Sequence, residues 1–169
     1  MFSTRSAFLV GFIVCAAAMG IALYSQHIIG LEPCPLCIFQ RISVIVLGVI
    51  FLIAALHNPQ TVGKRIYGFL LTVTTAVGIS IAGRHLWLQY GPHDELGCGP
   101  GLDYMMDVMP LDEVISSVFK GTGDCGEIVW SLFGISIPGW TLMFFILVLI
   151  FSLKTLFSKS QEIEYNRIR

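Results

Sequence analysis

The sequence predicts an all-α membrane protein, a four-helix transmembrane bundle with a short amphipathic interfacial helix in its second external loop. Its 169 residues are 55% hydrophobic and only 12% charged, about half the charged fraction of an average soluble domain. Four apolar runs also approach or exceed the ~17–20 residues that cross a bilayer as a helix. We expect residues 1–169 to form a single integral membrane domain. The formal net charge of −1 gives no indication of a nucleic-acid partner.

The four spans are predicted at about residues 7–29, 38–56, 66–88 and 137–157. The first reaches residue 29 if its polar step at 24–27 lies at the membrane surface. The second is long enough only if the residues from Cys37 to Arg41 form its first turn, and the third ends in the aromatic stretch "HLWLQY", which is typical of a membrane interface.

The first apolar run has an alternative interpretation as a secretory signal peptide. Arg5 precedes its apolar core, and small residues follow at 16–18. Because the apolar stretch continues past these alanines without a clear polar boundary, we favour a membrane span. The alternative would leave three helices.

Basic residues indicate the orientation of the spans, because cytoplasmic loops are enriched in lysine and arginine. Seven of the ten Lys and Arg residues fall on the side that holds both termini and the loop between the second and third spans. These seven are Arg5, Lys64, Arg65, Lys154, Lys159, Arg167 and Arg169. Both termini are therefore expected in the cytoplasm, with external loops at about residues 30–37 and 89–136.

The long external loop contains one helical pattern, "PLDEVISSVFK". Apolar residues recur in it at 111, 114, 115, 118 and 119, which places them on one face of a helix. The segment is too short and too polar to span a bilayer, so we predict an amphipathic helix on the membrane surface. The alternative is an ordinary helix packed against other parts of the protein.

The predicted topology separates the five cysteines. Cys15 lies within the first span, where an isolated thiol is expected to be an inert packing residue. Cys34, Cys37, Cys98 and Cys125 lie outside or at the outer membrane boundary, in a compartment where disulfides persist.

Three kinds of site compete for the external cysteines. A four-cysteine zinc site normally uses two C-x-x-C knuckles, and Cys98 and Cys125 are too far apart in sequence to form the second. Two structural disulfides are the plainer alternative, although a C-x-x-C bridge closes too small a loop to restrain the unfolded chain strongly. We favour redox-active pairs and expect no metal.

The stretch "EPCPLCIFQR" supports redox chemistry. Pro35 suits the first turn of a helix, which would put Cys37 where unpaired N–H groups and the helix dipole favour an anionic thiolate. Arg41 follows one turn later on the same face, where its charge would favour the same anion. Arg41 also fits a purely interfacial anchor. His85 fits either an ordinary hydrogen-bonded helix residue or a donor to a polar ligand between helices.

Taken together, these features resemble the DsbB family, the quinone-linked disulfide oxidases of the bacterial inner membrane. The resemblance covers essentially the whole chain. It rests on four spans, the C-x-x-C with an arginine four residues beyond it, two cysteines in a long second external loop, the "GDC" segment and the Pro138-Gly139-Trp140 start of the last span.

The resemblance implies that the chain reoxidises a periplasmic DsbA-type thiol oxidase and passes the electrons to a membrane quinone, either ubiquinone or menaquinone. Reduced DsbA would attack Cys98 and free Cys125, which would reduce a Cys34–Cys37 disulfide through Cys34. Cys37 would then face the quinone as a thiolate. Arg41, His85 and Gln26 are implied as quinone contacts; the glutamine at position 40 stands where some relatives have an acid, and we assign it no role.

Other functions fit parts of the same pattern. A vitamin K epoxide reductase-like enzyme shares four helices and a C-x-x-C, but that type places its C-x-x-C later in the bundle. A DsbB paralogue with a dedicated partner, and a non-enzymatic metal-binding or scaffold membrane protein, are the further alternatives. Stoichiometric metal without thiol oxidation would distinguish the last of these from an enzyme.

Overall fold

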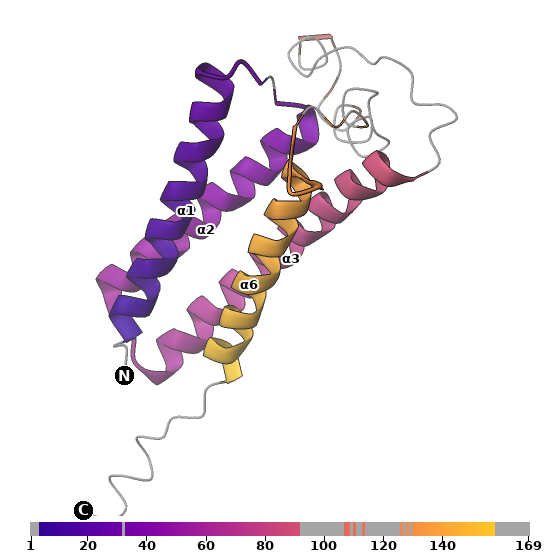
Figure 1. Cartoon of the computed structure of the whole chain (residues 1–169). Coiled ribbons are helices and arrows are strands. Elements are labelled where there is room, and N and C mark those ends of the chain that lie inside the picture. Colours follow the sequence, from indigo (N-terminus) through magenta and orange to yellow (C-terminus); the bar gives the residue numbers. More distant parts are fainter. Residues whose placement is uncertain are drawn as a thin grey trace, which may run out of the picture.

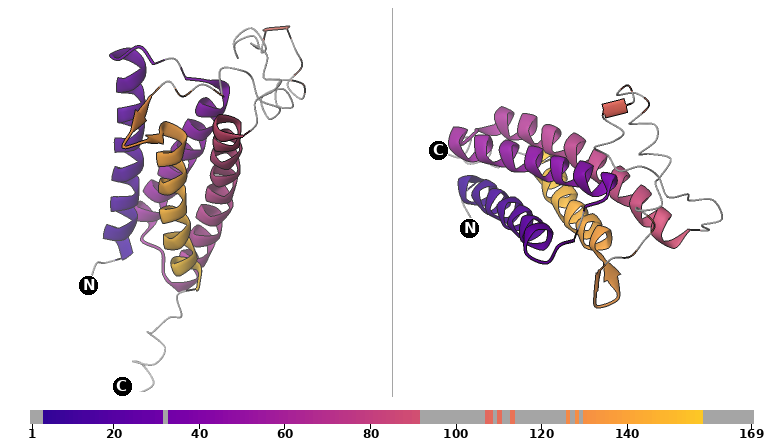
Figure 2. Two further views of the ribbon diagram at one scale, coloured as in Figure 1. Left: turned by 45° about the vertical axis from the view of Figure 1, so that its right-hand side comes forward. Right: turned by 90° about the horizontal axis from the view of Figure 1, so that it is seen from above.

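The structure, a computed structural model, describes residues 4–31, 33–91, 107–108, 110, 113, 126, 128 and 130–157. Its helices are α1 (Thr4–His27), α2 (Pro35–His57), α3 (Thr61–Tyr90) and α6 (Ile137–Phe157), and its strands are β1 (Ser131–Leu132) and β2 (Ile135–Ser136). The helices form one bundle, with the short strands beside the start of α6 (Figures 1 and 2). Neighbours pack in the order α1, α2, α3 and α6.

All four helices are long and apolar enough to cross a membrane. The predicted four-helix membrane bundle is therefore confirmed, with ends that differ from the predicted spans by a few residues. The largest difference is in α3, which covers 61–90 and not 66–88. At 1.5 Å per residue it is about 45 Å long and exceeds a hydrocarbon core of about 30 Å, so its ends reach into the interfacial layers.

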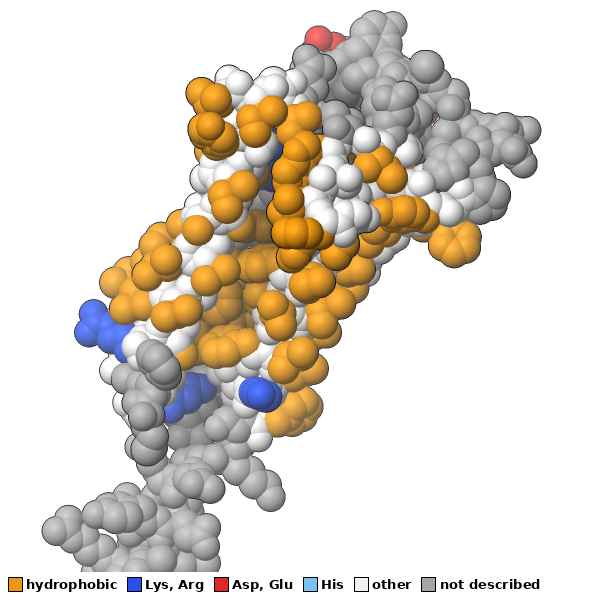
Figure 3. Space-filling view, in the orientation of Figure 1, with side chains coloured by type: hydrophobic (Ala, Val, Ile, Leu, Met, Phe, Trp, Pro, Cys, Tyr) orange, Lys and Arg blue, Asp and Glu red, His pale blue; other side chains and the backbone are white. Residues whose placement is uncertain are grey.

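On the face seen in Figure 3, apolar side chains follow the helices over most of their length. Large side chains that would be unfavourable in water, such as Ile13, Leu56 and Leu147, are 60%, 70% and 62% exposed. A lipid environment removes this cost, because hydrocarbon chains are as apolar as the side chains themselves.

One end of the bundle is closed by aromatic packing. Each helix contributes one ring to a cluster of Phe8, Phe51, Tyr67 and Phe151, with centroid separations of 5.9–6.5 Å between the contacting pairs. Phe8 and Phe51 are almost fully buried. Such ring pairs stabilise a core beyond their buried area, so this cluster fixes the four helices against one another at the end where α1 begins.

The opposite end carries the two cysteines at the start of α2 and the buried polar residues Gln40, His85 and Ser136. There α1 and α3 end and α2 and α6 begin, and we call it the cysteine end because Cys34 and Cys37 lie there. The antiparallel β1–β2 hairpin precedes α6, and its two turn residues, Phe133 and Gly134, both have positive φ (54° and 78°). This is the turn geometry that matches the twist of a two-residue hairpin. The predicted amphipathic helix at 111–119, Cys98 and Cys125 lie outside the described residues, apart from Glu113 within that helix.

The close contact between α3 and α6 depends on a glycine, which has no side chain. A Cβ added at Gly78 would lie 2.6 Å from the ring of the buried Phe145, whereas one at Gly83, on the same helix, would meet no atom within 4 Å. We expect Gly78→Ala to lower the free energy of unfolding by about 1–3 kcal/mol through overpacking. Gly83→Ala should leave it unchanged or raise it. Denaturation in mixed detergent micelles measures both, and equal stabilities would contradict this account of the interface.

Candidate functional site

The first turn of α2 is built by the C-x-x-C sequence itself. Cys34 is the N-cap residue, with extended backbone angles, and its sulfur accepts a hydrogen bond from the backbone N–H of Cys37 at 3.4 Å. Pro35 occupies the first turn, where its missing N–H costs nothing. The prediction that Cys37 lies in the N-terminal turn of the second span is confirmed.

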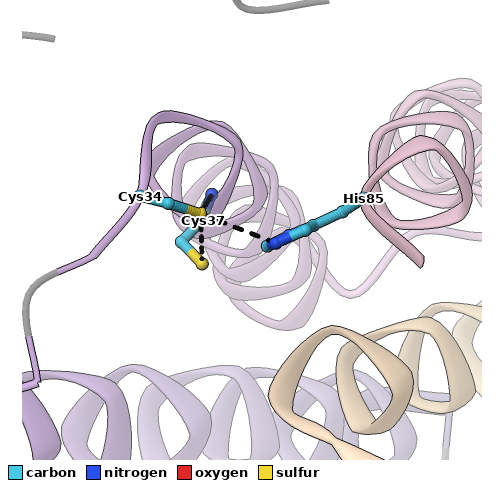
Figure 4. A group of neighbouring side chains, drawn as sticks. All are labelled: Cys34, Cys37 and His85. Carbon is cyan, nitrogen blue, oxygen red and sulfur yellow. Dashed lines mark hydrogen bonds between the residues drawn. The ribbon is translucent and has the colours of Figure 1, made fainter. Parts of the chain in front are cut away.

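This local geometry brings the two sulfurs together. Cys34 Sγ and Cys37 Sγ lie 3.0 Å apart, and both side chains are only partly buried (Figure 4). A disulfide has an S–S distance of about 2.0 Å, so a change of roughly 1 Å interconverts the dithiol and disulfide forms. The pair can therefore be oxidised without moving a helix.

His85 approaches the pair from α3. Its Nε2 lies 3.6 Å from Cys34 Sγ, within hydrogen-bonding range for sulfur, and Figure 4 shows the ring directed at the two cysteines. Its Nδ1 lies 3.0 Å from the amide Nε2 of Gln40. Gln40 and His85 are 4% and 2% exposed, so this hydrogen bond holds the imidazole in a fixed orientation within the apolar bundle.

The Gln40–His85 contact allows two neutral tautomers of the histidine. If the Gln40 amide donates to Nδ1, then Nε2 carries the proton and can donate it to a Cys34 thiolate. If the amide oxygen faces Nδ1–H, then Nε2 presents a lone pair to a Cys34 thiol or to a cation. In both cases the atom that faces Cys34 is Nε2, which suits His85 to exchange a proton with that sulfur.

Arg41 and Gln26, which the sequence singled out separately, lie in direct contact. Arg41 Nη1 donates to Gln26 Oε1, and its Nη2 donates to the backbone carbonyl of Ala22 at 3.2 Å. These bonds join α2 to the last turns of α1 at the cysteine end. Because the oxygen of Gln26 faces Arg41, the NH₂ group of Gln26 is the part that could donate to a ligand.

The structure thus brings Cys34, Cys37 and His85 into one cluster and places Arg41 and Gln26 as a second pair at the same end. Cys98 and Cys125 lie outside the described residues. Cys15 is 3% exposed in the apolar core, in line with the expected packing role.

Gln40 is the site residue that sequence reasoning missed. A carboxamide inside an apolar span needs a hydrogen-bonding partner, and this was the available signal. Its partner is 45 residues away on another helix, so the sequence did not reveal which residue it would be.

Comparisons with known proteins agree with the geometry. The family described as "Disulfide bond formation protein DsbB" matches residues 4–155. A protein named "Disulfide bond formation protein B" from Nitrosococcus oceani is 49% identical over 152 residues, covering 89% of this chain and 90% of the relative. Proteins of the same name from Marinobacter nauticus and Methylobacillus flagellatus are 47% and 44% identical, over 89% and 94% of this chain and 90% and 96% of their own lengths.

The Gln40–His85 pair predicts an effect on stability. Replacing Gln40 with leucine keeps much of the volume but leaves His85 Nδ1 buried without this partner, which should lower the free energy of unfolding by about 1–3 kcal/mol. Ser43→Ala, one turn further along α2, removes a hydroxyl that donates only to a carbonyl of its own helix. That variant should stay within about 0.5 kcal/mol of the parent. Denaturation in detergent micelles compares the two, and similar losses would mean that the pair contributes no specific stability.

Proposed function

The chain belongs to the DsbB family of disulfide bond formation proteins, and we propose that it reoxidises a periplasmic DsbA-type thiol oxidase and passes the electrons to a membrane quinone. The observation that carries this proposal is the pair of sulfurs 3.0 Å apart at the N-terminal turn of a membrane-spanning helix, beside a buried histidine. A pair of this kind at the end of a span can exchange with an aqueous thiol on one side and a lipid-soluble acceptor on the other.

The proposed exchange starts at the external loop. The thiolate of the reduced partner attacks Cys98 of a Cys98–Cys125 disulfide and forms a mixed disulfide, and Cys125 leaves. Attack by the second partner thiol on the mixed disulfide then releases oxidised partner and leaves Cys98 reduced. In total the partner loses two electrons and two protons.

The second exchange uses the described cluster. Cys125 attacks Cys34 of the Cys34–Cys37 disulfide, and Cys37 leaves as a thiolate. A thiolate that leaves at a helix N-terminus is stabilised by unpaired N–H groups and by the helix dipole, which favours this direction of attack. Cys98 then attacks Cys125 and releases Cys34, whose proton His85 Nε2 is placed to exchange.

The distribution of charge supports an orientation with both termini in the cytoplasm of a bacterium and the catalytic loops in the periplasm. Among the described residues, Arg5, Lys64, Arg65 and Lys154 lie at the end opposite the cysteine end (Figure 3). Lysine and arginine concentrate on the cytoplasmic side of membrane proteins. The cysteine end would then face the periplasm, where disulfides persist.

The polar groups at the cysteine end fit a quinone, whose two carbonyl oxygens need donors. Arg41 and Gln26 offer N–H groups there, and His85 would complete the set in the tautomer that carries a proton on Nε2. Ser136 Oγ, also at this end, is buried without a hydrogen-bond partner among the described residues, and its hydroxyl could donate to a quinone carbonyl oxygen; Gln89 Oε1 is likewise without a partner there but only accepts. A buried polar atom without a partner is rare unless a ligand or water satisfies it.

A bound quinone would supply an electron acceptor that dissolves in the bilayer. Such an acceptor is needed because DsbA is a strong oxidant, at about −120 mV, and ordinary dithiol proteins have lower potentials and cannot reoxidise it downhill. The protein's own contribution is to connect the aqueous thiols to the membrane boundary.

The cysteines give the first test of this function. Purified protein, supplied with reduced DsbA and a quinone, should reduce the quinone, as followed by its absorbance. Serine variants at Cys34, Cys37, Cys98 and Cys125 should each abolish steady turnover, because each interrupts the exchange sequence. Cys15→Ser is the matched control and should retain turnover, since Cys15 is buried in the core. Turnover in any of the four external variants would overturn the proposed route.

Arg41 gives the second test. Its hydrogen bonds to Gln26 and Ala22 are structural, whereas its charge would act on the thiolate and the quinone. Loss of a hydrogen bond to a charged group costs about 1.5–3 kcal/mol, so we expect Arg41→Met to raise the KM for quinone roughly tenfold or more. Arg41→Lys, which keeps the charge, should fall between Arg41→Met and the parent. If Arg41→Lys and Arg41→Met have the same KM, Arg41 serves only to join α1 and α2.

A further inference from the structure

We propose that the reduced Cys34–Cys37 pair and His85 form a binding site for a soft or borderline d¹⁰ cation such as Zn²⁺, and that occupancy holds the pair in its reduced state. The three donor atoms, two sulfurs and one imidazole nitrogen, lie within 4.8 Å of one another. This three-donor site is distinct from a four-cysteine zinc site, because it needs neither Cys98 nor Cys125. It goes beyond the proposed function and depends on neither quinone nor thiol partner.

The distances suit tetrahedral coordination. Zinc binds thiolate at about 2.3 Å and imidazole at about 2.0–2.1 Å, which puts a sulfur and a nitrogen ligand roughly 3.5 Å apart in a tetrahedron. The separation between Cys34 Sγ and His85 Nε2 is 3.6 Å. Two thiolate ligands would lie roughly 3.8 Å apart, so the sulfurs at 3.0 Å would separate by less than about 1 Å. Rotation of the partly buried cysteine side chains can supply this.

The groups around the three donors also fit a cation. Metal-bound histidines generally donate their second ring N–H to an outer-shell oxygen. The amide Nε2 of Gln40 lies 3.0 Å from His85 Nδ1, and a half-turn of this amide would bring the Gln40 oxygen to the same place, where it would accept that N–H. That arrangement is the tautomer in which Nε2 presents its lone pair to the sulfurs. The N-terminal turn of α2 favours the thiolate form that a cation needs at Cys37. Three protein ligands leave the fourth position for water or another donor.

Metal binding and disulfide formation exclude one another at this pair. Both thiols lose their protons when they bind the cation, so two protons are released and no electrons are transferred. A thiolate whose lone pair is donated to the metal is not available to form an S–S bond. Soft cations would therefore inhibit reoxidation of Cys34 and Cys37 reversibly, and a chelator would restore it.

The test uses the full-length Cys98→Ser/Cys125→Ser protein in detergent, reduced and under anaerobic conditions. Titration of Zn²⁺ against a chromophoric chelator should give one ion per chain. Titration with Cd²⁺ should show the sulfur-to-metal charge-transfer absorbance of two thiolates. Adding Cys34→Ser should abolish stoichiometric binding.

Variants of the residues around the two sulfurs should change the metal affinity by different amounts. In the same background, Gln40→Leu should weaken binding roughly 10- to 100-fold, as expected for the loss of an outer-shell partner. His85→Ala removes a ligand and should weaken it further. Gln40→Glu, whose carboxylate accepts from Nδ1–H, should bind as tightly as the parent or more tightly, which a merely structural role for Gln40 would not produce. His57→Ala is the matched control, because His57 pairs with Tyr67 at the other end of the bundle, and it should bind like the parent.

Three results would overturn the site: no stoichiometric Zn²⁺ binding, binding unaffected by Cys34→Ser, or affinity unchanged by His85→Ala. Circular dichroism of each variant verifies that its helices are intact. Quinone reduction is measured separately on the protein with all its cysteines. Turnover without metal binding would refute this inference alone, and metal binding without turnover would refute the proposed function alone.

Discussion

Inside a bilayer a polar side chain must find its partner within the protein, and the Gln40–His85 hydrogen bond meets this requirement between two helices. Buried Ser43 and Thr75 donate to carbonyls of their own helices, whereas the Thr72 hydroxyl of α3 donates to Ser152 of α6 at the side away from the cysteines. Gln40 of α2 and His85 of α3 bond to one another, so each helix supplies the partner that the other helix's polar side chain needs. The rotation of α3 that permits this bond also directs His85 Nε2 toward Cys34.

The two ends of the bundle have different roles: one holds the helices together, and the other holds the reactive side chains. The aromatic cluster of Phe8, Phe51, Tyr67 and Phe151 fixes all four helices at one end, and the hydroxyl of Tyr67 lies 3.0 Å from His57 Nδ1. The cysteine end is then able to hold buried polar side chains and two partly buried sulfurs, although such groups contribute less to packing than apolar ones. Stability and reactivity are thereby separated along the length of the helices.

Arg41 illustrates how one side chain serves both purposes. Its guanidinium carries several N–H groups in a planar fork, and two of its nitrogens reach α1 at Gln26 and Ala22. The same positive charge lies one turn along α2 from Cys37. An arginine can therefore tie α1 to the cysteine end and still act electrostatically on that end, which a lysine with its single ammonium group would do less well.

The sequence by itself determined the four membrane helices and the start of α2. Both depend on local properties. The membrane helices need only apolar runs of sufficient length. The start of α2 needs Cys34, whose sulfur accepts a backbone N–H of the first turn, and Pro35, which has no N–H to satisfy. The sequence also singled out Cys34, Cys37, Arg41, His85 and Gln26 as residues of interest, through residue type and a family resemblance. It did not determine their partners, and Gln40 was assigned no role.

Only the tertiary structure decided that His85 lies against Cys34 and Gln40, and that Arg41 bonds to Gln26 on the first helix. The physical reason is that a side-chain hydrogen bond between helices depends on how each helix is rotated about its own axis. That rotation is set by packing over the whole bundle, including the close approach at Gly78 and the aromatic cluster. The hydropathy pattern along the chain predicts the length of each helix, but it does not predict how each helix is rotated about its axis.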